Sequence, residues 1–187
     1  MKNRVFIIHG WDGNPHKDWI PWAKSELENR GYDVIAPLMP DTANPRIEPW
    51  VNTLKKIVSV PREDDIFIGH SIGCQTILRY LADLPEGQKV DKVVMIAPWF
   101  TLTNLESDES WKIADPWFKT PIDLSKAKTK ANSFTAIFSN NDSWVPLEEN
   151  KKMFEKRLNP KIIVLHNKGH FSEEEGVSEI PEILDLL

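Results

Sequence analysis

The stretch Asp65–Gln75, D-I-F-I-G-H-S-I-G-C-Q, joins a short apolar run to a pattern typical of a helix. Its centre fits G-x-S-x-G, in which a serine occupies a sharp turn between a strand and a helix. Glycines two positions on either side of Ser71 would let strand and helix pack closely around it. The stretch therefore predicts an exposed hydroxyl at the carboxyl end of a strand. The simpler alternative is that Ser71 only caps the helix expected over Ile72–Leu84.

Apolar runs like the one before Ser71 recur along the chain, and most are continuous, as is typical of strands covered on both faces. They are Val5–Ile8, Asp33–Ala36, Ile66–Ile68, Val93–Ala97, Phe134–Phe138 and Ile162–Leu165. Helical patterns separate them, and the clearest, between Ile47 and Val58, places its apolar residues on one face of a 3.6-residue period. This alternation predicts an α/β fold with a mostly parallel sheet of six strands and helices on both faces.

One segment, Trp99–Leu124, breaks the alternation, because it holds three tryptophans and shows no clean period. We predict an irregular insert, either a loop or a short-helix cap, that covers one end of the sheet. The 187 residues suit a single domain that spans the whole sequence.

Composition argues against several classes of partner. The net charge is −5, and the lysines are scattered among glutamates, so we expect no nucleic-acid partner. The only cysteine, Cys74, cannot form an internal disulfide and is expected to pack inside a helix. The four apolar residues Val5–Ile8 are too few for the core of a signal peptide, and no run is long enough to span a membrane. We therefore predict a cytoplasmic protein with a small-molecule substrate, and leave its oligomeric state open.

A serine hydroxyl needs a base, and His170 is the candidate among five histidines. It follows the last apolar run, where a loop could carry it to the serine. The side chain of His70 should point away from the hydroxyl of its neighbour, and His166 is expected to end the strand as a hydrogen-bonded residue. His166 and His170 have the H-x-x-x-H spacing of a metal pair, but Gly169 argues against the helix that this spacing requires. We therefore predict no metal.

The third member of the site is Asp142, in S-N-N-D-S-W-V-P after Phe134–Phe138. A carboxylate here could fix the tautomer of the histidine and stabilise its charged form. The same residues also make a good turn, which is the structural alternative. The order serine, acid, histidine along the chain favours the catalytic interpretation, because one of the known triad arrangements has that order.

An oxyanion hole would need two preplaced donors. We predict the main-chain N–H groups of Ile72 and Trp11, with Gly10 and Gly13 letting the loop after the first strand curl toward the substrate. The glycines do not form G-x-G-x-x-G, so we predict no dinucleotide and no other cofactor. We expect the strand order 2-1-3-4-5-6, in which Trp11 and Ser71 meet at the switch point between strands 1 and 3.

Aromatic residues follow several predicted strand ends, although aromatic residues generally belong more often to a core than to a pocket. The predicted substrate-binding residues are Gly10, His70, Trp99, Trp144 and Phe171.

Together, H-G-W, G-H-S-I-G-C, N-N-D-S-W-V-P and the final G-H-F resemble the YdeN-like and retinoblastoma-binding-protein-9-like family of small serine hydrolases, within the α/β-hydrolase superfamily. The resemblance runs through nearly the whole chain. It implies a compact α/β-hydrolase fold without a large cap domain, and a triad of Ser71, Asp142 and His170. It also implies ester or amide substrates whose identity is open. No L-x-C-x-E string is present, so binding of retinoblastoma-type pockets is not carried over.

The sequence thus predicts a metal-free serine hydrolase that cleaves a small ester, thioester or amide through an acyl-enzyme. One alternative is an interaction protein that kept the fold with little or no turnover. The other is an acyltransferase that passes the acyl group to an acceptor other than water.

Overall fold

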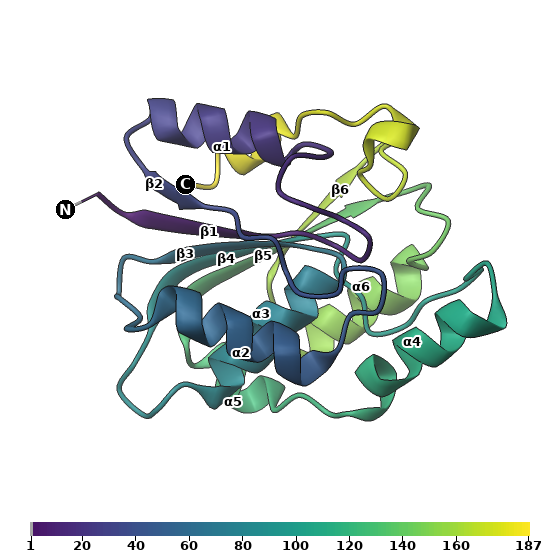
Figure 1. Cartoon of the computed structure of the whole chain (residues 1–187), viewed down its shortest axis with the longest axis horizontal. Coiled ribbons are helices and arrows are strands. Elements are labelled where there is room, and N and C mark those ends of the chain that lie inside the picture. The colour runs from purple at the N-terminus through teal and green to yellow at the C-terminus, as the bar shows by residue number, and fades with distance from the viewer. Residues whose placement is uncertain (1) are drawn as a thin grey trace.

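A parallel sheet with helices on both faces forms the centre of the protein, in a computed structural model that describes residues 2–187 (Figure 1). The strand order is β2-β1-β3-β4-β5-β6, and every neighbouring pair is parallel. The predicted fold class and strand order are therefore confirmed. The strands are β1 Arg4–Ile8, β2 Asp33–Ile35, β3 Ile66–His70, β4 Val90–Ile96, β5 Ala131–Ser139 and β6 Lys161–Leu165.

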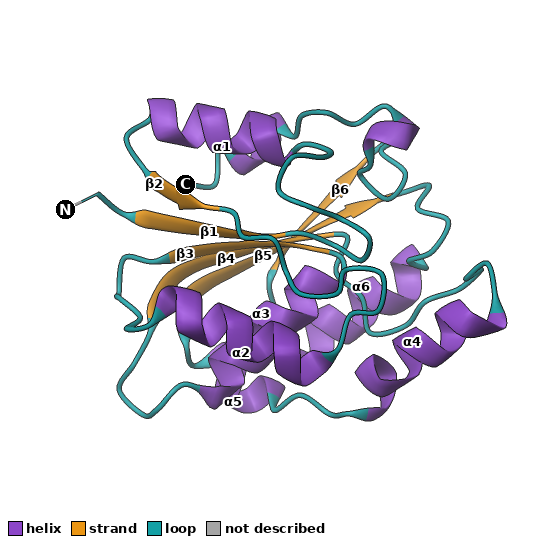
Figure 2. Ribbon diagram, in the orientation of Figure 1, coloured by secondary structure: helices purple, strands orange, loops and turns teal. Residues whose placement is uncertain are grey.

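The helices divide into two layers. α1 (Ile20–Asn29) covers one face together with the C-terminal segment and its 3₁₀ turns η1 (Glu173–Glu175) and η2 (Pro181–Ile183). On the other face lie α2 (Ile47–Val58), α3 (Ile72–Asp83), α5 (Leu124–Lys128) and α6 (Leu147–Arg157). Loops collect at the carboxyl ends of the strands, on the right in Figure 2. That edge of the sheet is where side chains from separate strands can meet.

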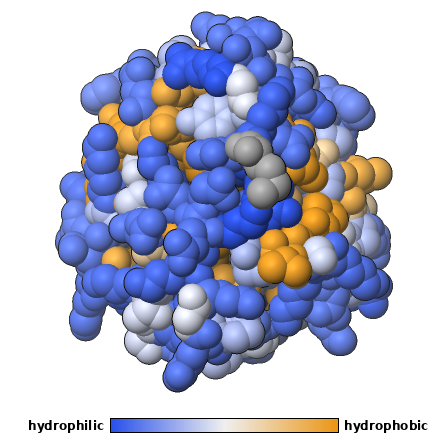
Figure 3. All heavy atoms as spheres, turned by 90° about the vertical axis from the view of Figure 1, so that its left-hand side faces the viewer, coloured by the Kyte–Doolittle hydropathy of each residue, from blue (hydrophilic) through white to orange (hydrophobic). Residues whose placement is uncertain are grey.

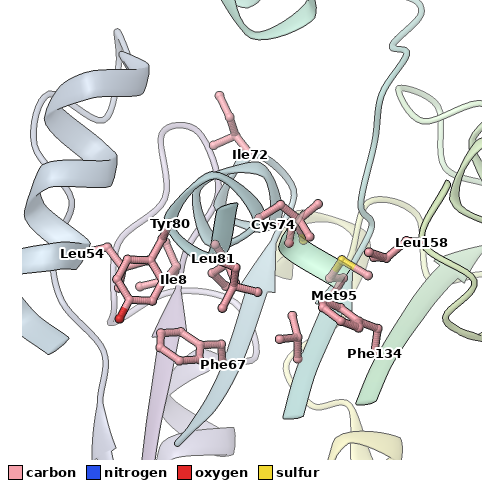
Figure 4. Close-up of a cluster of buried hydrophobic side chains, with 14 of the residues drawn as sticks. Ile8, Leu54, Phe67, Ile72, Cys74, Tyr80, Leu81, Met95, Phe134 and Leu158 are labelled. Atoms are coloured by element: carbon pink, nitrogen blue, oxygen red, sulfur yellow. The ribbon is translucent and has the colours of Figure 1, made fainter. Parts of the chain in front are cut away.

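The central helix is α3, and its burial explains why it holds the serine turn so firmly. Every residue from Ile72 to Leu81 is buried, including the polar Gln75 and Arg79. Figure 4 shows α3 packed on the sheet side chains Phe67, Met95 and Phe134. Cys74 belongs to this cluster, as the sequence indicated, and burial raises the pKa of its thiol. A helix enclosed in this way gives Ser71 a rigid support.

Residues Asp108–Lys119 form a helix, α4, inside the segment for which the sequence left open a loop or a short-helix cap. Only Ala114 and Trp117 of this helix are buried, so too few apolar positions repeat to give a helical period. Its start is capped by Ser107, whose Oγ accepts the N–H of Ser110 at 3.1 Å. In Figure 1, α4 lies beyond the carboxyl ends of the strands, on the outside of the molecule.

The opposite end of the molecule, at the amino ends of the strands, is mostly hydrophilic with separate hydrophobic areas (Figure 3). No helix within residues 2–187 is both long enough and apolar enough to cross a membrane.

Candidate active site

Ser71 occupies a strained turn between β3 and α3, with φ 53° and ψ −119°. A side chain at Gly73 would overlap the main-chain oxygens of Ile8 and His9, and one at Gly69 would press on the main chain of Cys74. Only glycine therefore lets α3 begin so close to β1. Ser71 itself is held by its N–H, which donates to the oxygen of Ile96 at the end of β4, at 2.8 Å. Together, these contacts stabilise a backbone conformation that is energetically unfavourable for a serine residue.

His170 and Asp142 meet in the loops after β6 and β5. Nδ1 of His170 lies 2.7 Å from Oδ2 of Asp142, and the two side chains are 10% and 2% exposed. The other carboxylate oxygen of Asp142 accepts the N–H groups of Trp144 at 2.9 Å and Val145 at 3.0 Å. The residue is thus both the turn former and the acidic partner that the sequence offered as alternatives. Nδ1 of His170 donates to the carboxylate, so in the neutral ring Nε2 is the nitrogen with a free lone pair.

Two further side chains hold the loop of His170. The carboxylate of Glu175 accepts the N–H of His170, and it occupies the space that a side chain at Gly169 would need. From the serine turn, Nε2 of His70 lies 2.8 Å from the carbonyl oxygen of His170. Burial, together with the nearby His170, lowers the pKa of His70 to about 3, so its ring is neutral. Sequence reasoning missed Glu175, because nothing in the pattern E-E-E distinguishes its third member.

Asparagine side chains join the loop after β5, which carries Asp142, to the loop after β6, which carries His170. Oδ1 of Asn141 accepts the N–H of Gly169 at 2.9 Å, and Oδ1 of Asn140 accepts the N–H of Asn167 at 2.9 Å. Nδ2 of Asn140 lies 3.0 Å from Nδ1 of His166, which takes part in this link and not in the Asp142 pair. The separation between Asp142 and His170 is therefore set by several bonds besides their own.

His9 orients the loop that follows β1. Its Nε2 accepts the N–H of Met39 at 3.0 Å, so Nδ1 carries the proton and donates to the carbonyl oxygen of Gly10 at 2.7 Å. Burial lowers the pKa of His9, which keeps the ring neutral. The same oxygen also accepts the N–H of Gly13 at 3.2 Å. Because the C=O and N–H of a trans peptide point in opposite directions, the N–H of Trp11 points away from His9.

The two predicted oxyanion donors lie on either side of Ser71. Within residues 2–187, the N–H of Trp11 has no hydrogen-bond partner. Ile72 is the first residue of α3, so its N–H has no acceptor inside the helix. The register of β1 with β3 aligns Ile8 with Gly69, so the two loops leave the sheet side by side. Both residues line the same cavity.

A cavity of about 400 Å³ opens over Ser71. It is lined by the predicted residues Gly10, Trp11, His70, Ser71, Ile72, Trp99, Trp144 and His170, and also by Leu102, Leu105 and carboxylates such as Glu106 and Glu173. Phe171 does not line it, and this prediction was wrong. Its backbone has φ 61°, and its fully buried ring packs in the cluster on the α1 face of the sheet.

The serine oxygen has one hydrogen-bond partner within residues 2–187, the indole nitrogen of Trp99. Nε1 of Trp99 lies 3.3 Å from Oγ of Ser71. Nε2 of His170 makes no hydrogen bond in the same part of the chain, so its lone pair is available to the hydroxyl. No hydrogen bond joins Oγ of Ser71 to Nε2 of His170 within residues 2–187, and catalytic hydrogen bonds are often long in unliganded sites.

Comparisons with known proteins bear on the family and the fold. The serine hydrolase family model matches residues 5–187. The chain is 27% identical to the hydrolase YdeN of Bacillus subtilis (strain 168), over 100% of this chain and 95% of that protein. The crystal structure of the B. subtilis ydeN gene product superposes with a TM-score of 0.89 at 26% identity, covering 100% of this chain and 96% of that one.

More distant structures share the fold. A carboxylesterase structure from the thaumarchaeon Nitrososphaera gargenis gives a TM-score of 0.71 at 16% identity, over 99% of this chain and 88% of that one. A YdeN-like hydrolase from Pectobacterium atrosepticum gives 0.66 at 18% identity, over 99% and 89%.

Proposed function

The chain belongs to the serine hydrolase family, and we propose that it cleaves a small ester, thioester or amide through an acyl-enzyme formed on Ser71. The observation that carries the proposal is that Ser71 and His170 line one cavity and that Asp142 lies 2.7 Å from Nδ1 of His170, although the three residues follow three different strands. A turn serine that served only as a helix cap would need neither of the other two. Moreover, Ser71 is the residue directly before α3, and its side chain makes no capping hydrogen bond to this helix.

In the first step, Nε2 of His170 takes the hydroxyl proton as Oγ of Ser71 attacks the carbonyl carbon of the substrate. The carboxylate of Asp142, 2.7 Å from Nδ1, stabilises the imidazolium that forms. The imidazolium then protonates the leaving oxygen, sulfur or nitrogen, and the bond from that atom to the carbonyl carbon breaks. Water repeats the sequence on the acyl-enzyme and releases the acid.

The negative charge that develops on the carbonyl oxygen is assigned to the main-chain N–H groups of Trp11 and Ile72. His9 supports this assignment, because it fixes the Gly10–Trp11 peptide with its carbonyl turned away from the cavity. Donors placed before the reaction cost no reorganisation, and one such donor is typically worth roughly 10²- to 10³-fold in kcat.

A fluorophosphonate probe with mass mapping of the labelled peptide tests the proposal. We expect labelling on Ser71, release of p-nitrophenol from p-nitrophenyl butyrate, and loss of most of both in Ser71→Ala and in His170→Ala. The double variant should be hardly worse than either single one, because triad members act as a unit. Losses that multiply would show that the two residues work separately.

Two other results would replace the proposal. A folded wild-type protein that the probe does not label would be an interaction protein on a hydrolase fold. Acyl product recovered on an added amine or alcohol, in preference to free acid, would identify an acyltransferase. Product analysis by mass spectrometry in the presence of each acceptor distinguishes these cases.

A further inference from the structure

We infer that the indole N–H of Trp99 donates a hydrogen bond to the nucleophilic oxygen of Ser71 during the reaction, which makes Trp99 a catalytic residue in addition to the triad. The inference rests on the proposed function, because it assigns a role toward the oxygen that attacks the substrate. It differs from the sequence prediction, in which Trp99 was only a wall of the substrate pocket.

The contact leaves the serine free to react. Nε1 of Trp99 lies 3.3 Å from Oγ, and the two residues are 1% and 8% exposed. An indole N–H can only donate, so it occupies a lone pair of Oγ and cannot take the hydroxyl proton. That proton remains available to Nε2 of His170. A competing acceptor at the place of Trp99 would instead divert the proton from the base.

The main chain of Trp99 is anchored from α3. Its carbonyl oxygen accepts a hydrogen bond from Nε2 of Gln75 at 3.2 Å. Oε1 of Gln75 in turn accepts a hydrogen bond from Nη2 of Arg79 at 3.2 Å. Arg79 also donates to the oxygen of Thr120 at 2.8 Å, where α4 ends. Burial lowers the pKa of this guanidinium to about 10, so it stays charged at neutral pH. Gln75 and Arg79 thus form a polar connection that fixes the position from which the indole reaches Ser71.

The residues after Trp99 are anchored from α6, by the fully buried Asn150. Its Oδ1 accepts the N–H groups of Phe100 at 2.7 Å and Thr101 at 3.0 Å, and its Nδ2 donates to the oxygen of Thr101 at 3.0 Å. The ring of Phe118 lies against the indole, with centroids 5.2 Å apart. The indole is therefore held from three directions with its one polar atom at Oγ. Such preorganisation is what a catalytic donor requires.

The bond should be strongest while the reaction proceeds. A neutral hydroxyl is a modest acceptor, but Oγ gains negative charge as its proton passes to Nε2 of His170, and a charged acceptor strengthens the bond. Once the bond from Oγ to the carbonyl carbon is made, the charge lies on the carbonyl oxygen, and the ester oxygen accepts weakly. In deacylation the bond from Oγ to the carbonyl carbon breaks. Oγ then gains negative charge again until it is protonated by His170. An interaction that strengthens only in the transition state raises kcat.

The first test compares Trp99→Phe with Trp111→Phe, a matched control on the same aromatic stack. The ring of Trp111 stacks on Phe118 at 6.3 Å but does not line the cavity. The second-order rate of labelling by the fluorophosphonate should fall about 10- to 100-fold in Trp99→Phe, the range for a hydrogen bond to a charged group. It should change by no more than about twofold in the control. For an ester substrate, kcat should fall while KM stays nearly constant.

A second readout does not depend on turnover. With 15N-labelled tryptophan, the eight indole N–H signals can be followed by NMR. Ser71→Ala should shift the signal that is missing in Trp99→Phe, and should leave the signal that is missing in Trp111→Phe nearly in place. Covalent labelling of Ser71 should move the same signal.

The results that overturn the inference are distinct from those that overturn the proposed function. Labelling in Trp99→Phe at the wild-type rate, or faster, shows that the indole does not assist Oγ. An unmoved Trp99 signal in Ser71→Ala shows that the contact is not made. In either case a wild type that is labelled on Ser71 leaves the proposed function standing. A wild type that is not labelled overturns both.

Discussion

The ring of His70 donates a hydrogen bond from Nε2 to the main-chain oxygen of His170, across 2.8 Å. This hydrogen bond joins the turn of Ser71 to the loop of His170. His70 itself stays unprotonated at neutral pH. Its partner on the other side is Trp19, whose ring meets the His70 ring edge to face at 6.0 Å. Burial and the nearby His170 keep the His70 ring neutral, although a protonated ring would donate to the same oxygen.

The lowered pKa of His70 predicts a loss of stability in acid. The pKa of His70 is about 3 in the folded protein and near 6.5 in the unfolded chain. Between these values the unfolded chain binds the extra proton, so the free energy of unfolding falls as pH falls, by at most about 1.4 kcal/mol per pH unit. His70→Gln removes this titration. Urea unfolding of both proteins at pH 7.5 and pH 5 should show the advantage of the wild type shrinking by about 2 kcal/mol.

His16→Gln, at an exposed loop position, serves as the control for that experiment. A wild-type advantage over His70→Gln that is the same at both pH values would contradict the assignment of a neutral His70.

Asp142→Asn should abolish most turnover while the protein stays folded. The asparagine oxygen can still accept the N–H groups of Trp144 and Val145, which keeps the turn. Its amide would donate to Nδ1 of His170, however, and so place the proton on Nε2, the nitrogen that must act as base. We expect kcat to fall about 10⁴-fold with a nearly unchanged melting temperature.

Asp123→Asn is the matched control, because Asp123 accepts the N–H of Lys126 in a similar capping turn at α5. It should retain wild-type kcat. Full activity in Asp142→Asn would assign the acid elsewhere or show that none is needed.

Gly73→Ala should destabilise the protein and disturb the serine turn. The added methyl group would meet the main-chain oxygens of Ile8 and His9, which belong to the central sheet and its first loop and cannot easily move. We expect a loss of about 1–3 kcal/mol or more in the free energy of unfolding, measured with urea, together with slower probe labelling.

Gly87→Ala provides the comparison for this variant. Gly87 has φ 81°, but a methyl group added there would meet no neighbour within 4 Å, so only the backbone cost of about 1–2 kcal/mol applies and labelling should be unchanged. Equal effects of the two substitutions on labelling would show that the close approach of α3 to β1 is unimportant.

The size of the cavity predicts a preference for short acyl chains. Each added methylene stabilises the bound substrate by about 0.8 kcal/mol only while it is buried against apolar side chains. A cavity of about 400 Å³ can bury only a short acyl chain in this way. In a p-nitrophenyl ester series from acetate to laurate, kcat/KM should rise over the first few carbons and then fall. Trp144→Ala should move the optimum to longer chains, because Trp144 lines the cavity beside His170. A wild-type optimum at laurate would indicate an open groove.

The sheet could be predicted because each strand is a local signal. Ile66–His70 is apolar at nearly every position and ends in a glycine-flanked turn, and the other runs repeat that pattern of apolar residues. The position of α4 could not be predicted, because only two of its residues are buried and its apolar residues show no helical period. Residues 99–124 therefore looked irregular, although a helix occupies much of the segment.

The triad residues could be proposed from sequence because each follows a strand. Their supports could not, because they depend on contacts between distant segments. Glu175 reaches His170 through a 3₁₀ turn. Gln75 fixes the main chain of Trp99, and Asn150 fixes the main chain of the next two residues. The error at Phe171 has the same origin. A residue next to a base in sequence can point to the opposite side of the loop, and its positive φ, which no pattern revealed, turns it into the core.

The strand order also sets the time at which a chain under synthesis can become active. Ser71 follows β3, and β3 can pair with β1 and β4 as soon as those strands have left the ribosome. The acid and the base follow β5 and β6, at the far edge of the sheet and later in the chain. A nascent molecule from which β6 has not yet emerged can therefore present the turn of Ser71 without His170 beside it.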